Sequence, residues 1–516
     1  MMAFSSLIPE RKSPIPGIPV IPGGTLWSGH LHLLQETNFQ KALHKWTVEH
    51  ADASGRCTFY MGPTTPSLSL THCEDVQLLL KASAYRSVFP LMETHFTQLF
   101  GTQNVGLLNG KEWKQQRSVL AKALHSKGVI KHHEKAIQET THRLVDKILA
   151  SSNDDGWFQC QDLVRLMKAL TLDCFGKASF HVDFRTCQEQ FFDGDDRNNS
   201  NATAIGPAFD KLTQELMRRV TSDIMLPTSH LYSLPTKANR NFALEKKKVL
   251  TLLQDIVSSR QKQMKNKEAE IPSDLLSGFL EHFASAGNVK MDEKELALII
   301  AQSILGLLFA GYETSSITMS YTVYLLSQHP DVLNHCLEEI EQVEQRGNGP
   351  DMPYLEAVIK ETLRLYPPAI STTRSAEHEM ELPAVAGGKV NDNDKIVVPK
   401  GTYLYFAIWM IQRDPKHFDN PNDFVPERWV TYSNDRSWEP RTGVNQKAWI
   451  PFSAGARACP GQRFAMQEMI TILSCLLPRL SFETLSDYVL EPCREGFVQT
   501  PKGGIPMIVR RRSAKG

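Results

Sequence analysis

The segment Pro451-Phe-Ser-Ala-Gly-Ala-Arg-Ala-Cys-Pro-Gly-Gln462 decides how the rest of this sequence is interpreted. Cys459 follows a loop that contains glycine and directly precedes a run with a helical pattern. The first backbone N–H groups of a helix, together with its dipole, favour a thiolate over a thiol. Gly455 and Gly461 allow the backbone to turn sharply and to approach a flat ligand that a Cβ would obstruct. The loop is therefore suited to present a thiolate to such a ligand.

A cation in the same loop narrows the choice of ligand. Arg457 lies two residues before the cysteine and is suited to bind a carboxylate. A thiolate in a rigid, apolar-walled loop is a suitable fifth ligand for haem iron. The pattern Phe452-x-x-Gly455-x-Arg457-x-Cys459-x-Gly461 closely resembles the haem-binding signature of the cytochrome P-450 monooxygenases. The alternative interpretation of Cys459 is a buried structural cysteine.

The composition is that of an ordinary globular chain. Of the 516 residues, 41% are hydrophobic and 22% charged, and 57 basic residues balance 57 acidic ones. This balance gives no indication of a nucleic-acid partner. The nine cysteines are scattered and form no C-x-x-C pair, so the sequence predicts neither a disulfide framework nor a zinc site. Such cysteine usage fits a reducing compartment.

The amino end leaves the location of the protein open. Residues 1–8 are too few to span a bilayer, which needs about 20 apolar residues, and they form a poor signal peptide. Residues 13–24 are rich in proline and are expected to be stiff and extended. In microsomal members of the resembled family, such a segment follows a membrane anchor. Either this protein is cytoplasmic or peripheral, or the chain is incomplete at its start and belongs to the endoplasmic reticulum.

The sequence predicts one short amino-terminal segment, residues 1–24, followed by a single domain over residues 25–516. Within that domain, Arg56–Leu70 is expected to form a β-hairpin and Cys73–Ala82 a helix. The stretch from Tyr85 to Leu108 is expected to be an irregular connection of the kind that tends to be functional. A second hairpin is expected near the carboxyl end, over Gly496–Arg511.

A tryptophan and an arginine mark a second contact with the cofactor. Trp113 and Arg117 lie four residues apart in a helical pattern, so their side chains share one face. A surface helix with an aromatic stripe is the simpler alternative. The W-x-x-x-R spacing is similar to a motif that binds a haem propionate in the cytochrome P-450 family. By the same resemblance, Arg374 is a second candidate for a propionate.

The longest helical pattern runs from Glu293 to Gln328 and would extend about 50 Å at 1.5 Å per residue. Asp292 and Glu295 are expected to form a capping box at its start. A membrane-spanning helix is the rival interpretation. Its strongly apolar part, Leu296–Ala310, contains two polar residues and is too short to span a bilayer. A buried central helix is therefore predicted.

Inside this helix, the run Ala310-Gly311-Tyr312-Glu313-Thr314 matches the oxygen-activation motif of the cytochrome P-450 family, (A/G)-G-x-(D/E)-T. The resemblance implies that Ala310 and Gly311 lie against the haem, while Thr314, with Glu313 and ordered water, relays protons. The simpler alternative is that Thr314 bonds back to the carbonyl four residues earlier and bends the helix.

Three charged residues are expected to be structural. Glu361 and Arg364 lie three apart on a predicted helix. In the resembled family such a pair is completed by a later arginine, and Arg428 stands at the corresponding place. Because buried charges require full pairing, all three are interpreted as scaffold and not as catalysts.

The resemblance extends from about Pro14 to Arg511. It implies a mainly α fold with minor β structure, a helical prism around a buried haem b (iron protoporphyrin IX) with a small β-rich region. The implied reaction inserts one oxygen atom from O2 into a lipophilic substrate, which could be fatty-acid-like, a sterol or a terpenoid. A haem-thiolate isomerase or dehydratase that does not use O2, or a haem sensor, remains the alternative.

Electrons are expected to come from NADPH through a separate redox partner, either a flavoprotein reductase or a ferredoxin. No glycine fingerprint for a dinucleotide is found after the Cys459 loop. The expected docking face carries that loop and the helix with Lys111, Lys114 and Lys122. The apolar connection Ile224–Pro235 could belong to the core, or it could contact substrate or a membrane surface.

Overall fold

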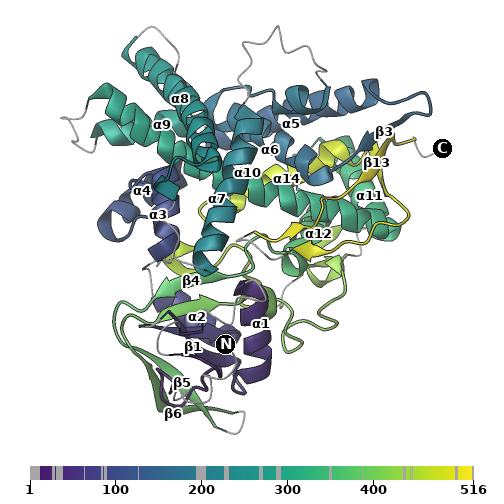
Figure 1. Cartoon of the computed structure of the whole chain (residues 1–516). Helices are drawn as coiled ribbons and strands as arrows, with labels where there is room; N and C mark the ends of the chain where they lie inside the picture. The colour runs from purple at the N-terminus through teal and green to yellow at the C-terminus, as the bar shows by residue number, and fades with distance from the viewer. Residues whose placement is uncertain are drawn as a thin grey trace.

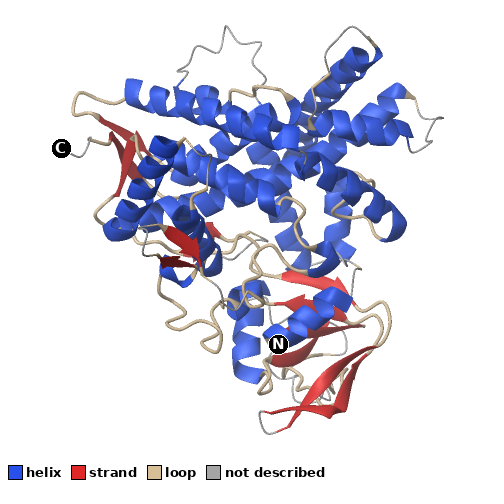
Figure 2. Cartoon of the chain, turned by 180° about the vertical axis from the view of Figure 1, so that it is seen from behind, coloured by secondary structure: helices blue, strands red, loops and turns tan. Residues whose placement is uncertain are grey.

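The computed structural model shows a large helical part and a smaller β-rich part at one end of the molecule (Figure 1). The β-rich part holds the amino-terminal strands and helices, and the carboxyl end lies on the helical part (Figures 1 and 2). The structure describes residues 12–513 except for 26–28, 31–38, 63, 83–84, 86–89, 126, 193–204, 226–231, 267–270, 273, 286–291, 348–350, 387–388, 434–436, 442, 444–445 and 494–497.

The β-rich part is organised by a four-stranded sheet in the order β1-β2-β7-β4. Strands β2 and β7 are parallel, whereas the other two pairs are antiparallel. The predicted hairpin over Arg56–Leu70 is confirmed as β1 and β2. The sheet is flanked by a twisted ribbon of β5 and β6 and by two helices (Figure 1). The bounds of these elements are α1 Phe39–His50, β1 Arg56–Met61, β2 Thr65–Leu70, α2 Cys73–Ala82, β4 Thr372–Ser375, β5 Met380–Ala386, β6 Lys389–Val398 and β7 Tyr403–Phe406.

The helical part is built around α10 (Glu293–Gln328), whose bounds are those predicted from the sequence. Of its 36 residues, 20 are buried, and it packs against α6, α8, α12 and α14. By length and composition α10 is the single described helix that could cross a membrane. The surrounding helices are α4 Gly110–His125, α5 Lys127–Ala150, α6 Leu163–Phe180, α7 Ile205–Met225, α8 Lys237–Lys265, α9 Leu275–Ser285, α11 Pro330–Arg346, α12 Pro353–Leu365 and α14 Gln462–Leu476.

The start of α10 differs from the prediction in one respect. Asp292 occupies the N-cap position with an extended backbone, but its side chain makes no capping hydrogen bond. The capping box with Glu295 is therefore wrong. Glu293 pairs instead with Lys265 at the end of α8. The helix begins where predicted because its apolar surface is buried by its neighbours, and most helical stability comes from such packing.

Residues 85–108 are not wholly irregular, because they contain helix α3 (Pro90–Phe100). His95 and Leu99, four residues apart, are both buried. In the parallel pair, Phe100 is buried and Phe96 is partly buried. This helical spacing is short and interrupted by threonines, which is why the sequence pattern did not indicate it. The helix packs against α7 and α10, so the segment contributes to the interior beside the central helix.

The carboxyl-terminal strands do not form the predicted hairpin. Strand β13 (Met507–Arg511) pairs with β10 (Leu480–Thr484) and with β3 (Trp157–Cys160), whereas β12 (Thr500–Pro501) pairs with β11 (Pro492–Cys493). The hairpin over Gly496–Arg511 is therefore wrong. The partners of β13 lie far away in the sequence, so local turn signals could not reveal them.

An ionic cluster with a fully buried Glu361–Arg364 pair joins α12 to the segment that follows α13 (Ile408–Ile411). The Glu361 carboxylate accepts two bonds of 2.8 Å from the Arg364 guanidinium and one of 3.1 Å from Arg428 Nε. It also accepts bonds from Trp429 Nε1 at 3.0 Å and from the Val425 N–H at 3.1 Å. This geometry supports the structural role predicted for all three charged residues.

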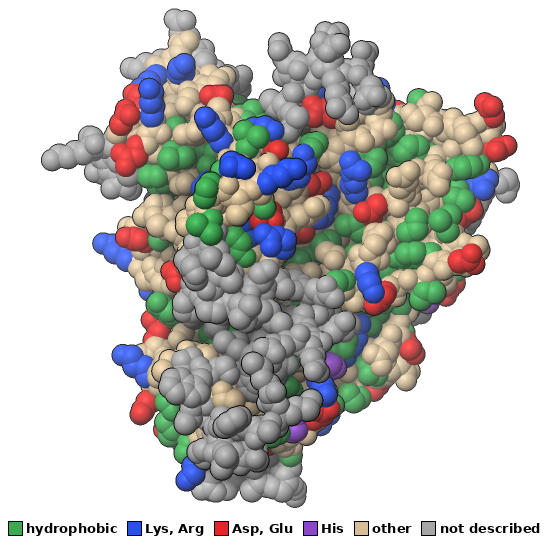
Figure 3. Space-filling model, in the orientation of Figure 1, with side chains coloured by type: hydrophobic (Ala, Val, Ile, Leu, Met, Phe, Trp, Pro, Cys, Tyr) green, Lys and Arg blue, Asp and Glu red, His purple; other side chains and the backbone are tan. Residues whose placement is uncertain are grey.

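The proline-rich segment near the amino end lies against the folded domain. Ile15, Ile18 and Ile21 are buried, and the Ile21 N–H donates to the Thr58 carbonyl over 2.9 Å. The segment is thus held by β1. Basic and acidic side chains are interspersed on the face seen in Figure 3, as expected from a chain with equal numbers of both.

Candidate active site

The loop before α14 holds Cys459 in a closed turn. The Cys459 N–H donates to the Phe452 carbonyl over 2.8 Å, and the Ala458 N–H donates to the Gly455 carbonyl over 3.1 Å. Gly455 has a φ of +70°, and a Cβ at this position would lie 2.1 Å from the Leu80 carbonyl oxygen of α2. Only glycine therefore fits here. The loop is fixed from behind by the end of α2.

Cys459 differs from the other cysteines in its exposure. All nine lie in the described part of the chain; six are buried, two are partly buried, and Cys459 is exposed. Burial raises the pKa of Cys57 to about 11 and that of Cys160 to about 12, so these thiols stay protonated at neutral pH. A large, flat, metal-bearing cofactor can reach only an accessible thiol. Cys459 is the cysteine best placed to bind one.

Helix α4 brings the predicted tryptophan and arginine to this loop. Arg117 Nη2 donates to the Ala458 carbonyl over 2.7 Å. The Arg457 guanidinium carbon lies 3.8 Å from the centre of the Trp113 ring, close enough for a cation–π contact. Arg457 also bonds to the Asn109 side chain. Trp113 and Arg117 thus meet Arg457, which follows them by more than 300 positions, beside Cys459.

Arg117 forms no ion pair with any residue that the structure describes. It is about half-buried, and this burial lowers its pKa while Cys459 acts in the opposite direction. A half-buried guanidinium beside an accessible thiol is suited to bind the carboxylate of a ligand. The predicted role of Arg117 toward a propionate is therefore compatible with its surroundings.

Arg374 reaches the same loop from strand β4. Its side chain is 1% exposed, and it donates to the Thr373 carbonyl over 2.7 Å and to Ser453 Oγ over 3.4 Å. Ser453 is one of few non-glycine residues with positive φ, at +61°. Strand β4 therefore places a second buried guanidinium against the cysteine loop.

The middle of α10 carries an open stripe in a helix that is otherwise buried. Ala310 is exposed, and Gly306 and Thr314, one turn to either side, are partly exposed. Tyr312 and Glu313, which lie between Ala310 and Thr314 in the chain, are buried. Because positions four apart share one face, these small side chains leave room for a flat group. Thr314 Oγ1 donates to the Ala310 carbonyl over 2.8 Å, as expected for a threonine inside a helix.

Glu313 has one partnered oxygen and one without a partner. Lys168 Nζ of α6 donates to Oε1 over 2.9 Å. The second oxygen is buried and has no hydrogen-bond partner among the described residues. Burial opposes the charged form of Lys168, but Glu313 and Asp210 offset it and raise the Lys168 pKa. Sequence reasoning missed Lys168, although a single lysine in the apolar run Leu163–Phe175 was a signal of a buried ion pair.

These features fit a haem. An accessible thiol lies in a rigid loop, two guanidinium groups adjoin that loop, and small residues open one face of the central helix. Helix α14, which starts directly after the loop, packs against α10. The loop that carries the thiol is therefore continuous with a helix that contacts the central helix.

Comparison with known proteins supports this assignment. The sequence profile of the cytochrome P450 family matches residues 19–507. The chain belongs to the cytochrome P450 family. Its mainly α fold with a minor β part is that of the family, and it is accordingly a haem-containing, iron-dependent monooxygenase of the oxidoreductase class.

Individual cytochromes P450 from animals and plants resemble the chain over most of its length. Cytochrome P450 3A11 of Mus musculus is 25% identical over 492 residues, which cover 92% of this chain and 88% of the relative. Cytokinin hydroxylase of Arabidopsis thaliana is 25% identical over 454 residues, covering 87% and 79%. Probable cytochrome P450 4s3 of Drosophila melanogaster is 35% identical over a shorter region of 217 residues, 42% of this chain and 40% of the relative.

An aromatic wall adjoins the open stripe of this cytochrome P450. Phe309 precedes Ala310, and its ring centroid lies 5.3 Å from that of Phe100 and 6.5 Å from that of Phe96. Both partners come from α3, the helix that the sequence did not predict. The space beside the central helix is therefore apolar on this side.

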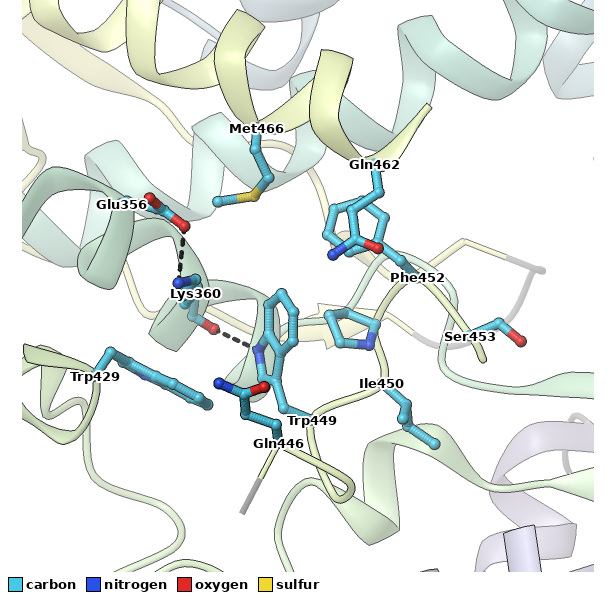
Figure 4. A pocket seen from close by; sticks show the side chains of 11 residues that line it. Glu356, Lys360, Trp429, Gln446, Trp449, Ile450, Phe452, Ser453, Gln462 and Met466 are labelled. Carbon is cyan, nitrogen blue, oxygen red and sulfur yellow. Dashed lines mark hydrogen bonds and ion pairs between the residues drawn. The ribbon is translucent and has the colours of Figure 1, made fainter. Parts of the chain in front are cut away.

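A separate cavity of about 370 Å³ lies between α12 and the residues that lead into the cysteine loop. Trp429, Trp449 and Met466 enclose it, together with the Glu356–Lys360 ion pair of 2.7 Å (Figure 4). Trp449 Nε1 donates to the Lys360 carbonyl over 3.1 Å. The cavity adjoins Phe452, whose carbonyl accepts from Cys459, and so it lies beside the thiol-bearing loop and not at the stripe of α10.

Proposed function

We propose that this cytochrome P450 binds haem b through Cys459 and inserts one oxygen atom from O2 into a lipophilic substrate. The observation that carries the proposal is the exposed Cys459 thiol in a loop contacted by Arg117 and Arg374. Haem, when bound, supplies the iron at which O2 is reduced by two electrons and from which one oxygen atom is transferred.

The residues that hold the cofactor come from four elements. Cys459 is the iron ligand, and Phe452, Gly455 and Gly461 shape its loop. Arg117 and Arg374 bind the propionates because each presents a guanidinium beside that loop. The remaining contacts are Trp113, Arg457, Ala310 and Gly311.

Thr314 and Glu313 deliver protons in this proposal. The Thr314 hydroxyl lies on the open stripe, so it can bind a water molecule while it donates to the Ala310 carbonyl. The buried, unpartnered oxygen of Glu313 is the adjacent proton acceptor. A positioned acid and hydroxyl of this kind accelerate proton transfer by about 10²–10⁴-fold. An isomerase or dehydratase that does not use O2 would not need this pair.

The substrate is proposed to be lipophilic, in the range of a fatty acid, a sterol or a terpenoid. Support comes from the aromatic wall of Phe96, Phe100 and Phe309 beside the stripe. Pockets lined by aromatic groups with few polar atoms favour apolar ligands. Incubation with compounds of the three classes, followed by the spin-state change in the visible spectrum, tests which one displaces water from the site.

Electrons are proposed to come from NADPH through a flavoprotein reductase or a ferredoxin that docks beside the cysteine loop. Lys111, Lys114 and Lys122 of α4 are exposed there, and docking through them should weaken as salt screens the charges. NADPH oxidation by the purified chain without a partner would contradict the proposal.

A peripheral contact with a membrane, at the endoplasmic reticulum or another surface facing a reducing compartment, is proposed through the start of α8. Leu234 and Leu244 are 50% and 52% exposed, and Lys237 and Arg240 are exposed beside them. Apolar residues next to cations suit an anionic bilayer surface. Part of the predicted connection Ile224–Pro235 lies outside the described residues.

The iron ligand is tested by the spectrum of the reduced protein with carbon monoxide. The wild type should show the red-shifted band of thiolate ligation, and Cys459→His should lose it. Cys475→Ser, which removes a partly buried thiol, should keep it. Retention of the band in Cys459→His would refute the assignment.

A further inference from the structure

A second cluster of ligating side chains lies away from the haem region, at the start of helix α2. Cys73 is the first residue of the helix, Glu74 follows it, and His417 comes from the segment after α13. One ligating atom from each, the thiol, a carboxylate oxygen and an imidazole nitrogen, lies within 4.8 Å of the other two. The cluster joins residues that are more than 340 positions apart, so no sequence spacing indicated it.

The donor set is that of a zinc ion. Thiolate, imidazole and carboxylate are the three ligand types that zinc combines in proteins, and hard cations such as Mg²⁺ would not select sulfur. A thiolate, a carboxylate and a neutral imidazole together balance the two positive charges of Zn²⁺. Three protein ligands also leave one tetrahedral position for water. We infer that Cys73, Glu74 and His417 form a zinc-binding site.

Charged and titratable side chains surround the ligands. His72 Nε2 lies 3.2 Å from a Glu74 carboxylate oxygen, and His72 Nδ1 lies 3.5 Å from Asp75. Asp75 is held in turn by two bonds from Arg56, of 2.6 Å and 2.8 Å, and both of these side chains are buried. Such supporting shells fix the direction of ligating groups at metal sites. Arg56 and Asp75 thus anchor the start of α2 in the core, whereas the side chain of Glu74 is 60% exposed.

Binding must displace a proton from sulfur. Burial raises the pKa of Cys73 to about 12; Glu74 and Asp414 act in the same direction, and Lys447 opposes them. The thiol is thus protonated at neutral pH, and Zn²⁺ binds as one S–H proton leaves.

The site would tie helix α2, which supports the cysteine loop, to the segment after α13, which is held by α12. The other end of α2 contacts that loop, because the Leu80 carbonyl lies against Gly455. The segment with His417 follows Gln412, whose carbonyl accepts from the buried Arg364 over 3.0 Å. A zinc ion between Cys73 and His417 would link these two supports and raise thermal stability.

The experiment uses the haem-loaded protein, so that Cys459 is already bound to iron. After a wash with chelator, the protein is dialysed against ZnCl2, and bound zinc per haem is determined by elemental analysis. One tight zinc is expected in the wild type. Cys73→Ser and His417→Gln should each bind zinc at least about 100-fold more weakly than the wild type. Loss of an outer-shell partner would weaken binding by only about 10–100-fold. Cys475→Ser and His378→Gln, which change a partly buried cysteine and an exposed histidine elsewhere, should bind normally.

X-ray absorption at the zinc edge reads the ligands without interference from iron. The inference requires one sulfur at about 2.3 Å and nitrogen or oxygen at about 2.0–2.2 Å. A shell of nitrogen and oxygen alone would mean adventitious binding at surface histidines such as His132 and His181, and would overturn the proposal. Unchanged zinc affinity in His417→Gln would also overturn it. His417 is partly exposed, so this variant should fold even if Cys73→Ser does not.

Discussion

Two buried glutamates of this cytochrome P450, Glu361 and Glu313, differ in how many of their oxygens accept hydrogen bonds. Glu361 is 0% exposed and both of its oxygens accept hydrogen bonds, five in total from Arg364, Arg428, Trp429 and Val425. Glu313 is 6% exposed, and Lys168 satisfies one oxygen while the other has no partner among the described residues. A saturated carboxylate is held in place as part of the scaffold. A half-satisfied one keeps an oxygen that can exchange a proton.

The same substitution at both positions should give the largest contrast. Glu361→Gln replaces one acceptor oxygen with an amide NH2 donor and leaves Arg364 and Arg428 without a counter-charge. Breaking a buried ion pair costs about 3–5 kcal/mol, so little haem-loaded protein should accumulate. Glu313→Gln should lose less, because it deprives one cation, Lys168, of its counter-charge and its amide oxygen can still accept the Lys168 hydrogen bond. The yield of haem-loaded protein and its Tm measure the difference between the two variants. Equal values for Glu361→Gln and Glu313→Gln would contradict the distinction between the two glutamates.

Thr314→Ala tests whether the region around Glu313 in the middle of α10 takes part in proton transfer. The variant should bind haem and substrate and still consume NADPH and O2, but product formed per NADPH should fall as peroxide is released. The loss should approach the lower end of the 10²–10⁴-fold range of positioned acid–base groups, less where a water molecule replaces the hydroxyl.

Thr318→Ala is the matched control, because Thr318 makes the same bond to a carbonyl four residues earlier, over 2.8 Å, at a buried position. Its product yield per NADPH should stay near that of the wild type. If Thr314→Ala and the wild type form the same amount of product per NADPH, the proton-transfer role of Thr314 is contradicted and its role is to bend the helix.

Lys168→Met removes the partner of Glu313 and leaves a carboxylate buried without compensation. We expect the free energy of unfolding to fall by about 1–3 kcal/mol or more, together with poorer coupling of NADPH oxidation to product. Lys168→Arg should restore part of both. Lys177→Met, on the same helix, breaks a more exposed pair with Glu139 of 2.6 Å and should change stability by less than about 1 kcal/mol. A similar effect of both substitutions would contradict the importance of the buried pair.

A third buried glutamate, Glu468, should give the smallest change among these variants. Its protonation makes the stability of the protein depend on pH. Burial raises the pKa of Glu468 on α14 from 4.5 to about 8, although the Ser315 hydroxyl partly opposes this. The folded state therefore binds this proton more tightly than the unfolded state, and its stabilising contribution is lost as pH rises from about 4.5 to 8. Glu468→Gln should remove that loss.

The measurement is Tm at pH 6 and at pH 9 for wild type and Glu468→Gln. The variant should gain a few degrees over the wild type at pH 9 relative to pH 6. Glu483→Gln, at an exposed position of β10, should show no such change. A parallel fall of Tm in wild type and Glu468→Gln would show that another group titrates.

The parts that sequence predicted well were those with strong local patterns. The cysteine loop, the W-x-x-x-R helix and α10 carry fixed spacings, and the structure brings Trp113, Arg117 and Arg457 to Cys459. What could not be predicted depends on contacts between distant segments. The pairing of β13 with β3, the Lys168–Glu313 pair and the cluster around His417 each join residues from far-apart positions. Their spacing in the chain carries no signal of their meeting in space.

The parallel pairing of β2 with β7 has a consequence for how the protein is made. Ser67–Leu70 pair with Tyr403–Phe406, so more than 300 residues must leave the ribosome before β2 receives its second partner. At about 5–20 residues per second this takes tens of seconds, during which an unpaired strand edge can associate with other chains. Gly455, which seats the cysteine loop on α2, emerges later still. The nascent chain therefore completes its cofactor pocket only near the end of synthesis, and its early strands are where a chaperone has most to protect.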